Sequence, residues 1–164
     1  MTYDFSVRKL ELCDEDINLA IDFMLKLSEY QKIEDVSMIN NDNMIKFLSK
    51  DSCEAVFGCV DGKPIAFMYY YFNYPILVGE KCIYIDSLYI DESFRDKGIG
   101  HKMINYIANK AVNEGYRRLE WTCLNWNEPA LNFYKKLGAN RADNISLHRV
   151  PYDVIVELAN KPMV

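Results

Sequence analysis

Apolar residues recur at intervals of three or four in several stretches of the chain, which is the spacing of amphipathic helices. The clearest helix is predicted over residues 98–114, where every fourth position is apolar and Gly115 is placed to end it. A helix from Asp14 to about Ser28 begins with three consecutive acidic residues, which suit the positive end of a helix dipole. Shorter helices are predicted over residues 41–49 and 127–137.

Other stretches have the apolar, β-branched and aromatic composition that is typical of strands. Residues 55–60 and 65–74 are predicted to form a hairpin around the Asp61-Gly62 turn. Further strands are predicted over residues 2–8, 81–90, 118–124 and, in one or two pieces, 145–158. Because the strands come first as a hairpin and later alternate with helices, the pattern predicts a mixed α/β (α+β) sheet.

Length, composition and charge favour one globular domain that covers residues 1–164. Half of the 164 residues are hydrophobic, which is enough for one continuous core, and the chain has no linker or repeat. Lys plus Arg number 19 and Asp plus Glu number 24, so the net charge is −5. This balance argues against a nucleic-acid partner, which requires a basic surface, and suits a cationic partner better.

Cysteines and apolar runs bear on metal binding and on location. Five cysteines without a CxxC pair, and only two histidines, argue against a metal site of the zinc type. Scattered cysteines among apolar neighbours are typical of reduced thiols in a cytoplasm. The first residues show no apolar signal segment, and the longest apolar stretch, 65–72, is too short to span a bilayer. We therefore expect a cytoplasmic protein with no membrane partner.

The segment Arg95-Asp96-Lys97-Gly98-Ile99-Gly100 carries the clearest chemical signal, because it joins a predicted strand to the strongest helix. Two glycines let a ligand approach the backbone closely, and the free N–H groups of a first helical turn bind phosphate. The Walker phosphate motif is absent, and Met103 stands where a dinucleotide-binding motif has its third glycine. A plain helix start with solvated charges remains the alternative.

Three motifs in this order resemble the GCN5-related N-acetyltransferase (GNAT) superfamily. The pattern R-x-x-G-x-G at 95–100 resembles the acetyl-CoA loop, and N-x-x-A-x-x-x-Y at 127–134 resembles the second motif. Within the superfamily the chain is most similar to the diamine (spermidine/spermine-type) acetyltransferases, through residues 67–74, 95–100 and 126–136. The resemblance covers roughly residues 5–158. It implies a mostly antiparallel sheet with one splayed strand pair, flanked by helices.

The resemblance implies acetyl-CoA as cosubstrate and assigns residues to it. The backbone of a splayed strand pairs with the pantetheine arm, and the N–H of Leu88 holds the thioester oxygen. The loop from Arg95 to His101 cradles the pyrophosphate, although His101 also fits an exposed helix position without a ligand. The cofactor residues implied in this way are Leu88, Tyr89, Ile90, Arg95, Asp96, Lys97, Gly98, Ile99, Gly100, His101 and Asn127.

Two residues match the family's catalytic groups. Tyr134 matches the general acid that protonates the leaving thiolate, and its alternative is packing on the core face of its helix. Asp86 stands where the resembled enzymes have a Glu that deprotonates the amine, and a water can make up the missing methylene. A strand aspartate that caps a neighbouring backbone group is the alternative for Asp86. None of the cysteines lies in a nucleophile motif, which fits direct transfer.

The amine is the least defined part of the resemblance. Residues expected to bind it are Tyr30, Gln31, Glu34, Asp35, Asp86 and Glu120. Gln31 replaces a Glu of the polyamine enzymes, and Lys32 adds a positive charge beside it, so a shorter or zwitterionic, thialysine-like amine is favoured over a polyamine. A solvated helix end is the alternative for this cluster. A homodimer is implied by the resemblance; a peptide N-acetyltransferase and a non-catalytic CoA-binding sensor are the competing functions.

Overall fold

Five strands form one open sheet within residues 3–161, the part of the chain that the computed structural model describes. The strands are β1 (Phe5–Lys9), β2 (Cys53–Val60), β3 (Lys63–Asn73), β4 (Cys82–Ile90) and β5 (Arg118–Trp121). Neighbours pair antiparallel in chain order from β1 to β4, and β5 pairs parallel with β4. The predicted mixed and mostly antiparallel sheet is confirmed.

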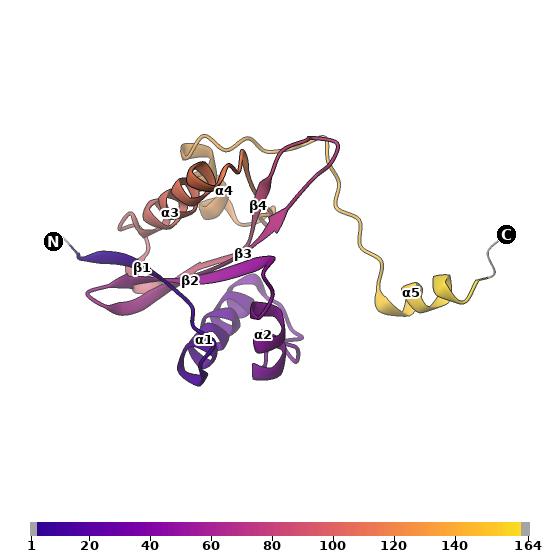
Figure 1. The fold of residues 1–164 in the computed structure, drawn as a ribbon, viewed down its shortest axis with the longest axis horizontal. Helices are drawn as coiled ribbons and strands as arrows, with labels where there is room; N and C mark the ends of the chain where they lie inside the picture. Colours follow the sequence, from indigo (N-terminus) through magenta and orange to yellow (C-terminus); the bar gives the residue numbers. More distant parts are fainter. Residues whose placement is uncertain (1–2, 162–164) are drawn as a thin grey trace. The chain divides into compact units, whose positions relative to one another are not determined.

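Helices lie on both faces of this sheet (Figure 1). α1 (Asp14–Gln31) and α2 (Asn41–Leu48) lie on one face, and α3 (Ile99–Glu114) lies on the other. A short 3-10 turn, η1 (Glu92–Phe94), precedes α3. The predicted helix periods are confirmed in all three α-helices of this part of the chain.

Two buried clusters, one on each face, hold these helices to the sheet. On the first face, Ile17, Ala20 and Phe23 of α1 pack with Phe57 and Phe67 of the strands. On the second face, the every-fourth-residue stripe of α3 packs against β2, β3 and β4. Gly58 of β2 lies beneath this stripe. A Cβ at position 58 would lie 2.6 Å from Met103 Sδ and 3.2 Å from Ala66 Cβ, which is closer than side chains normally pack. Close seating of α3 on the sheet therefore requires a residue without a side chain.

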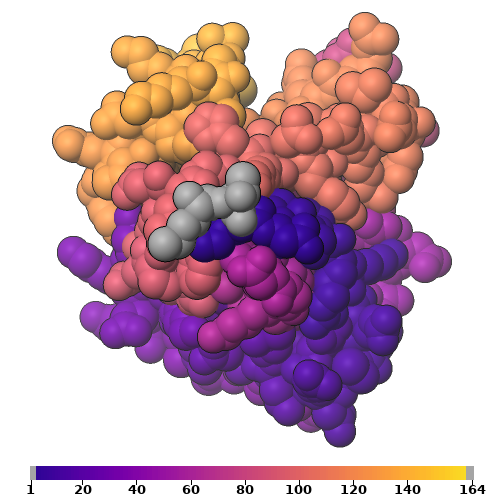
Figure 2. All heavy atoms as spheres, turned by 90° about the vertical axis from the view of Figure 1, so that its left-hand side faces the viewer, coloured from indigo at the N-terminus to yellow at the C-terminus, as the bar shows by residue number. Residues whose placement is uncertain are grey.

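β1 forms an outer edge of the sheet and is tied to the start of α1. In Figure 2 its residues, drawn in indigo, lie at the surface beside the β2–β3 turn; the Asp61 N–H donates to Asp4 O at 2.9 Å. The guanidinium of Arg8 donates two hydrogen bonds of 2.7 Å to the buried carboxylate of Asp16. Thr2, which the predicted first strand included, lies outside the described residues.

The chain divides into two compact units, Met1–Asn127 and Glu128–Val164, and each is described by itself. The second unit contains α4 (Glu128–Lys136) and α5 (Tyr152–Ala159). The strands predicted over 145–158 are wrong, because residues 145–151 form no strand and α5 occupies residues 152–158. The β-branched run 154–156 resembles a strand, but Pro151 fixes the backbone before the helix and its carbonyl accepts the Ile155 N–H at 3.0 Å.

Candidate active site

A β-bulge in β4 presents Asp86. Tyr69 pairs with Ser87 and Tyr70 pairs with Ile85, so Asp86 is an extra residue with no counterpart on β3. Bulges of this kind re-aim a side chain and are frequent beside active sites. The Asp86 side chain is exposed, and Ser87 Oγ donates a 3.0 Å hydrogen bond to its Oδ2. The neighbouring hydroxyl thus orients a carboxylate that solvent can reach.

Beyond the bulge, β4 loses its partner on one side. Its pairing with β5 ends at Ile85↔Trp121, while β4 continues to Ile90. The Asp91 N–H donates to Ile65 O on β3 at 2.9 Å. Because N–H directions alternate along a strand, the N–H groups of Leu88 and Ile90 point away from β3, toward the open edge. The splayed strand pair is therefore present, with Leu88 at its edge.

The loop that follows has a backbone suited to an anion. Asp96 and Gly98 both have positive φ, 59° and 78°, and the first helical hydrogen bond of α3 runs from the Lys102 N–H to Gly98 O at 3.2 Å. The N–H groups of residues 99–101 therefore precede the helical bonding pattern. A Cβ built on Gly98 would meet no atom within 4 Å. This open space and the exposed helix start fit the pyrophosphate of CoA.

Arg95 joins this loop to the open edge. Its Nε donates to Ile90 O at 3.0 Å, and its Nη1 lies 3.5 Å from a Glu92 carboxylate oxygen. The guanidinium carbon lies 5.1 Å from the ring centre of Tyr30 and 5.5 Å from that of Tyr89. Both distances are within the range of cation–π contacts, so Arg95 is held beside the last residues of β4.

Lys97 and Lys102 lie on aromatic rings nearby. Lys97 Nζ is 5.2 Å from the ring centre of Phe94, and Lys102 Nζ is 5.0 Å from that of Phe5. The positive charges of the predicted loop are therefore concentrated around the start of α3.

Tyr30 and Asn127 meet directly, although the sequence assigned them to different ligands. The Tyr30 hydroxyl donates to Asn127 Oδ1 at 3.0 Å. The ring of Trp126 lies 5.9 Å from that of Tyr30 and 5.4 Å from Lys32 Nζ. Sequence reasoning used Trp126 only as part of a motif and missed it as a site residue. Its position next to Asn127 was the available signal.

One of the acidic residues after α1, Asp35, forms local hydrogen bonds with Ser37. Asp35 Oδ1 accepts hydrogen bonds from the Ser37 hydroxyl at 2.6 Å and from the Ser37 N–H at 3.0 Å. The hydroxyl contact and then the N–H contact lower the pKa of Asp35. Gln31 is half-buried and Glu34 is exposed. Asp35 therefore closes a turn here, while Glu34 remains at the surface.

Glu120 lies on β5 opposite Tyr84. One of its carboxylate oxygens lies 3.1 Å from Arg118 Nη1, and the other accepts from the buried Cys82 thiol at 3.5 Å. Burial and the nearby Glu120 carboxylate raise the pKa of Cys82 to about 12, so this thiol remains protonated as a donor. Arg118 was not predicted as a site residue.

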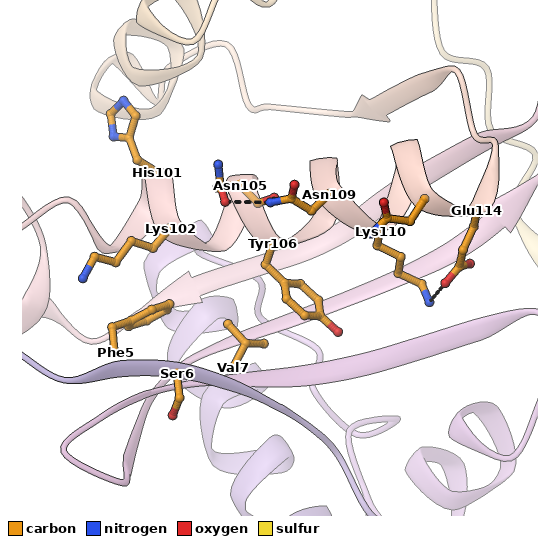
Figure 3. A pocket seen from close by; sticks show the side chains of 11 residues that line it. Phe5, Ser6, Val7, His101, Lys102, Asn105, Tyr106, Asn109, Lys110 and Glu114 are labelled. Atoms are coloured by element: carbon orange, nitrogen blue, oxygen red, sulfur yellow. Dashed lines mark hydrogen bonds and ion pairs between the residues drawn. The ribbon is translucent and has the colours of Figure 1, made fainter.

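A groove of about 830 Å³ lies between β1 and α3, away from the bulge (Figure 3). His101, Asn105 and Asn109 line it from α3, and the Asn109 amide donates to Asn105 Oδ1 at 2.8 Å. His101 was predicted at the cofactor loop, and the structure places it where that loop adjoins this groove. Asp86 and Leu88 do not line the groove.

Tyr134 lies on α4 in the second unit and is half-buried. Its ring contacts that of Phe133 at 5.4 Å. Its carbonyl accepts the Ala139 N–H at 3.1 Å, and the Gly138 N–H donates to Lys135 O at the same distance. With Gly138 at φ 84°, this is a Schellman ending, which fixes the last turn of α4 and with it the backbone of Tyr134.

The family model for the acetyltransferase (GNAT) family matches residues 19–139, which include the bulge, the open edge, the loop and α4. The chain belongs to the GNAT family. The resemblance inferred from the three motifs is therefore confirmed.

Two similar proteins are named for small amine substrates. The chain is 33% identical over 89 residues to the L-ornithine N5-acetyltransferase NATA1 of Arabidopsis thaliana, a match that covers 54% of this chain but only 39% of that protein. It is 28% identical over 173 residues to a thialysine N-epsilon-acetyltransferase of Sus scrofa, covering 95% of this chain and 99% of that one.

A solved acetyltransferase structure supports the fold. The aminoglycoside N-acetyltransferase AAC(6')-Iy, in complex with CoA, superposes with a TM-score of 0.72 at 14% identity, covering 92% of this chain and 97% of that one. At this identity the likeness concerns the fold alone.

Two further properties follow from the described residues. None of the helices within residues 3–161 is long and apolar enough to cross a bilayer. The same residues contain no group of three or more His, Cys, Asp or Glu side chains that could hold a metal ion.

Proposed function

We propose that this GNAT protein transfers the acetyl group of acetyl-CoA directly to a primary amine of a small cationic metabolite. One observation carries the proposal: the bulged Asp86 lies two residues before Leu88, whose N–H points to the open edge of β4. Amide formation from a thioester requires a base and an oxyanion donor, and here the two lie two residues apart on one strand.

The residues of the first unit fit CoA. Leu88 and Ile90 offer backbone groups at the open edge, and the loop with Asp96 and Gly98 offers helix-start N–H groups with free space before them. Arg95, Lys97 and Lys102 supply the positive charge that phosphates need. Acetyl-CoA supplies the activated acetyl group when it is bound.

Each proposed step has a residue in a defined role. Asp86 accepts the proton of the substrate ammonium through a water, which leaves a neutral amine. The amine nitrogen forms a bond to the thioester carbonyl carbon while the Leu88 N–H stabilises the negative charge on its oxygen, a contact worth about 2.7–4 kcal/mol in such sites. As the carbon–sulfur bond breaks, the Tyr134 hydroxyl donates its proton to the sulfur. The nitrogen loses its second proton as the amide forms, and this proton restores the neutral Tyr134 hydroxyl. The products are the acetamide and free CoA thiol.

The substrate class rests on charge and on the relatives' names. Glu120, Glu34 and Asp86 bring acidic groups to the first unit, while Gln31 is neutral. Related proteins are named for thialysine and ornithine, both of which are amino acids with a terminal primary amine. We therefore favour such an amine over a longer polyamine, and we propose a cytoplasmic homodimer as the working form.

Release of CoA thiol tests the proposal. The purified protein is given acetyl-CoA with a panel of diamines, polyamines, basic amino acids and short peptides, and thiol formation is followed. Tyr134→Phe is expected to lower kcat by about 10²–10⁴-fold while CoA affinity stays within about twofold. Tyr152→Phe, at an exposed position on α5, is the matched control and keeps full activity. Absence of thiol release with every amine would refute the proposal.

A further inference from the structure

A row of three side chains crosses the sheet on the face that α1 and α2 cover. Tyr71 on β3 pairs with Tyr84 on β4, which pairs with Glu120 on β5. Paired residues project to the same side of a sheet, so these three side chains are neighbours. The rings of Tyr71 and Tyr84 stack, with centres 4.9 Å apart and planes at 22°. The row therefore presents an aromatic platform that ends in a carboxylate.

Arg118 adds a positive charge beside that carboxylate. It precedes Glu120 by two residues on β5, so it lies on the same face, and its Nη1 is 3.1 Å from Glu120 Oε1. The two side chains are 38% and 40% exposed. An ion pair this open contributes little to stability and leaves both charges accessible to a ligand. The buried Cys82 thiol, which donates to Glu120 Oε2, holds the carboxylate in place.

One carboxylate next to one guanidinium matches a ligand that carries both charges. An α-amino acid head has an ammonium, which a carboxylate binds, and a carboxylate, which a guanidinium binds with charge-assisted hydrogen bonds. A plain diamine has only the first of these groups, so Arg118 would repel it. The pair therefore discriminates between amines that carry an α-carboxylate and amines that do not.

The distance to the reacting end fits a short side chain. Tyr84, opposite Glu120, and Asp86 are two residues apart on β4, roughly 6.6 Å along the strand. The terminal nitrogen of a diamino acid lies roughly 5–6 Å from its α-carbon when extended, by summing bond lengths. Burial first, and then the neighbouring Tyr84 and Asp86, raise the pKa of Tyr71, with Glu120 contributing as well. The Tyr71 hydroxyl therefore stays neutral within the field of both carboxylates.

We propose that Arg118 and Glu120 bind the α-amino acid head of the acyl acceptor, with the Tyr71–Tyr84 platform along its aliphatic chain and its terminal amine at Asp86. The substrate class is an α-amino acid whose side chain ends in a primary amine. This assignment rests on the proposed acetyl transfer and adds to it the residues that select the substrate.

Pairs of amines that differ only in the carboxylate test the assignment. L-ornithine is compared with putrescine, and L-lysine with cadaverine, by kcat/KM from thiol release. The wild type is expected to prefer each amino acid by at least about 10-fold, the value of one charge-assisted contact. Arg118→Gln is expected to lower kcat/KM for L-ornithine about 10–100-fold through KM, and to leave putrescine unchanged or improved.

Two variants serve as controls. Arg117→Gln removes the neighbouring arginine, which is 74% exposed and lies 3.7 Å from Glu80, and is expected to change neither substrate. Arg118→Lys keeps the charge without the planar fork and is expected to lie between wild type and Arg118→Gln in KM for L-ornithine. The folding of both Arg118 variants is checked by thermal melting. If Arg118→Gln proves to be unfolded, Arg118→Lys still provides the comparison with the wild type.

The outcomes separate this inference from the function on which it rests. If no amine releases thiol, the proposed acetyl transfer itself fails. If amines are acetylated but ornithine and putrescine react equally well, the amino acid head is not recognised and the inference is overturned. Equal losses on both substrates in Arg118→Gln would overturn it too, because the arginine would then act only on the fold.

Discussion

Replacing Gly98 by alanine separates the anion-binding role of the loop from its contribution to folding. Gly98 has φ 78°, a conformation that costs a residue with a Cβ about 1–2 kcal/mol. Its Cβ would meet no protein atom, so the variant is expected to fold with only this strain. For a chain of this length, that loss lowers Tm by about 2–8 °C.

Gly62 provides a matched control. It has φ 79° in the β2–β3 turn, and a Cβ there would also meet no atom within 4 Å. Gly62→Ala is therefore expected to lose the same stability as Gly98→Ala. The two variants differ in only one respect, which is whether the strained residue lies before the start of α3.

CoA affinity is the discriminating measurement. In Gly98→Ala, relief of the backbone strain at residue 98 is expected to rotate the N–H groups of residues 99–101 that follow it. Loss of one charge-assisted hydrogen bond weakens binding by about 1.5–3 kcal/mol, or roughly 10–150-fold in Kd by calorimetry. Gly62→Ala should bind CoA as the wild type does. Equal CoA affinity in the two variants would refute the assignment of this loop.

Three further substitutions probe other parts of the molecule. Asp86→Asn should abolish the acidic limb of the kcat/KM profile, and a limb that persists would clear Asp86 as the base. Asp16→Asn should destabilise the fold by about 1–3 kcal/mol in urea at pH 7. The Arg8 hydrogen bonds lower the pKa of Asp16, so the stability difference between wild type and Asp16→Asn should shrink as pH falls below about 4. A stability difference that grows in acid would contradict the ion pair. Tyr70→Phe removes the 2.7 Å hydrogen bond from a buried hydroxyl to Glu54 and should cost about 1–2 kcal/mol. An unchanged urea midpoint would show that Lys9 and Lys110 satisfy Glu54 without it.

The loop and the helices could be predicted because their signals are local. Glycine spacing, charged neighbours and a four-residue apolar period all lie within one segment, and α3 begins one residue from the predicted position. The positive φ of Asp96 could not be predicted, since few residues other than glycine adopt it.

The bulge in β4 is visible in the spacing of its apolar residues, which departs from the regular alternation of a strand. Ile83, Ile85, Leu88 and Ile90 all face the α3 cluster, so their spacing is two, three and two. The interval of three marks the extra residue. A strand with a regular period would place Leu88 on the opposite face from Ile85, and only the observed pairing with β3 resolves this.

The row Tyr71–Tyr84–Glu120 depends on the pairing of three different strands. Register between β4 and β5 determines that Tyr84 faces Glu120, and no local pattern encodes it. The sequence did predict that Glu120 binds the amine. It did not indicate that Arg118 would accompany it, because an alternating arginine and glutamate on a short strand are equally consistent with a solvated edge.

Gly58 connects the packing of the sheet to the loop at residues 95–100, which it does not itself belong to. α3 acts as a rigid rod, roughly 24 Å long, whose height above the sheet is set where Met103 rests on this glycine. Met103 is fully buried, so a methyl group at position 58 would force this side chain to repack beneath the start of α3. Under the proposed acetyl-CoA assignment of this loop, a larger side chain at position 58 is therefore expected to lower cofactor affinity without altering one charge.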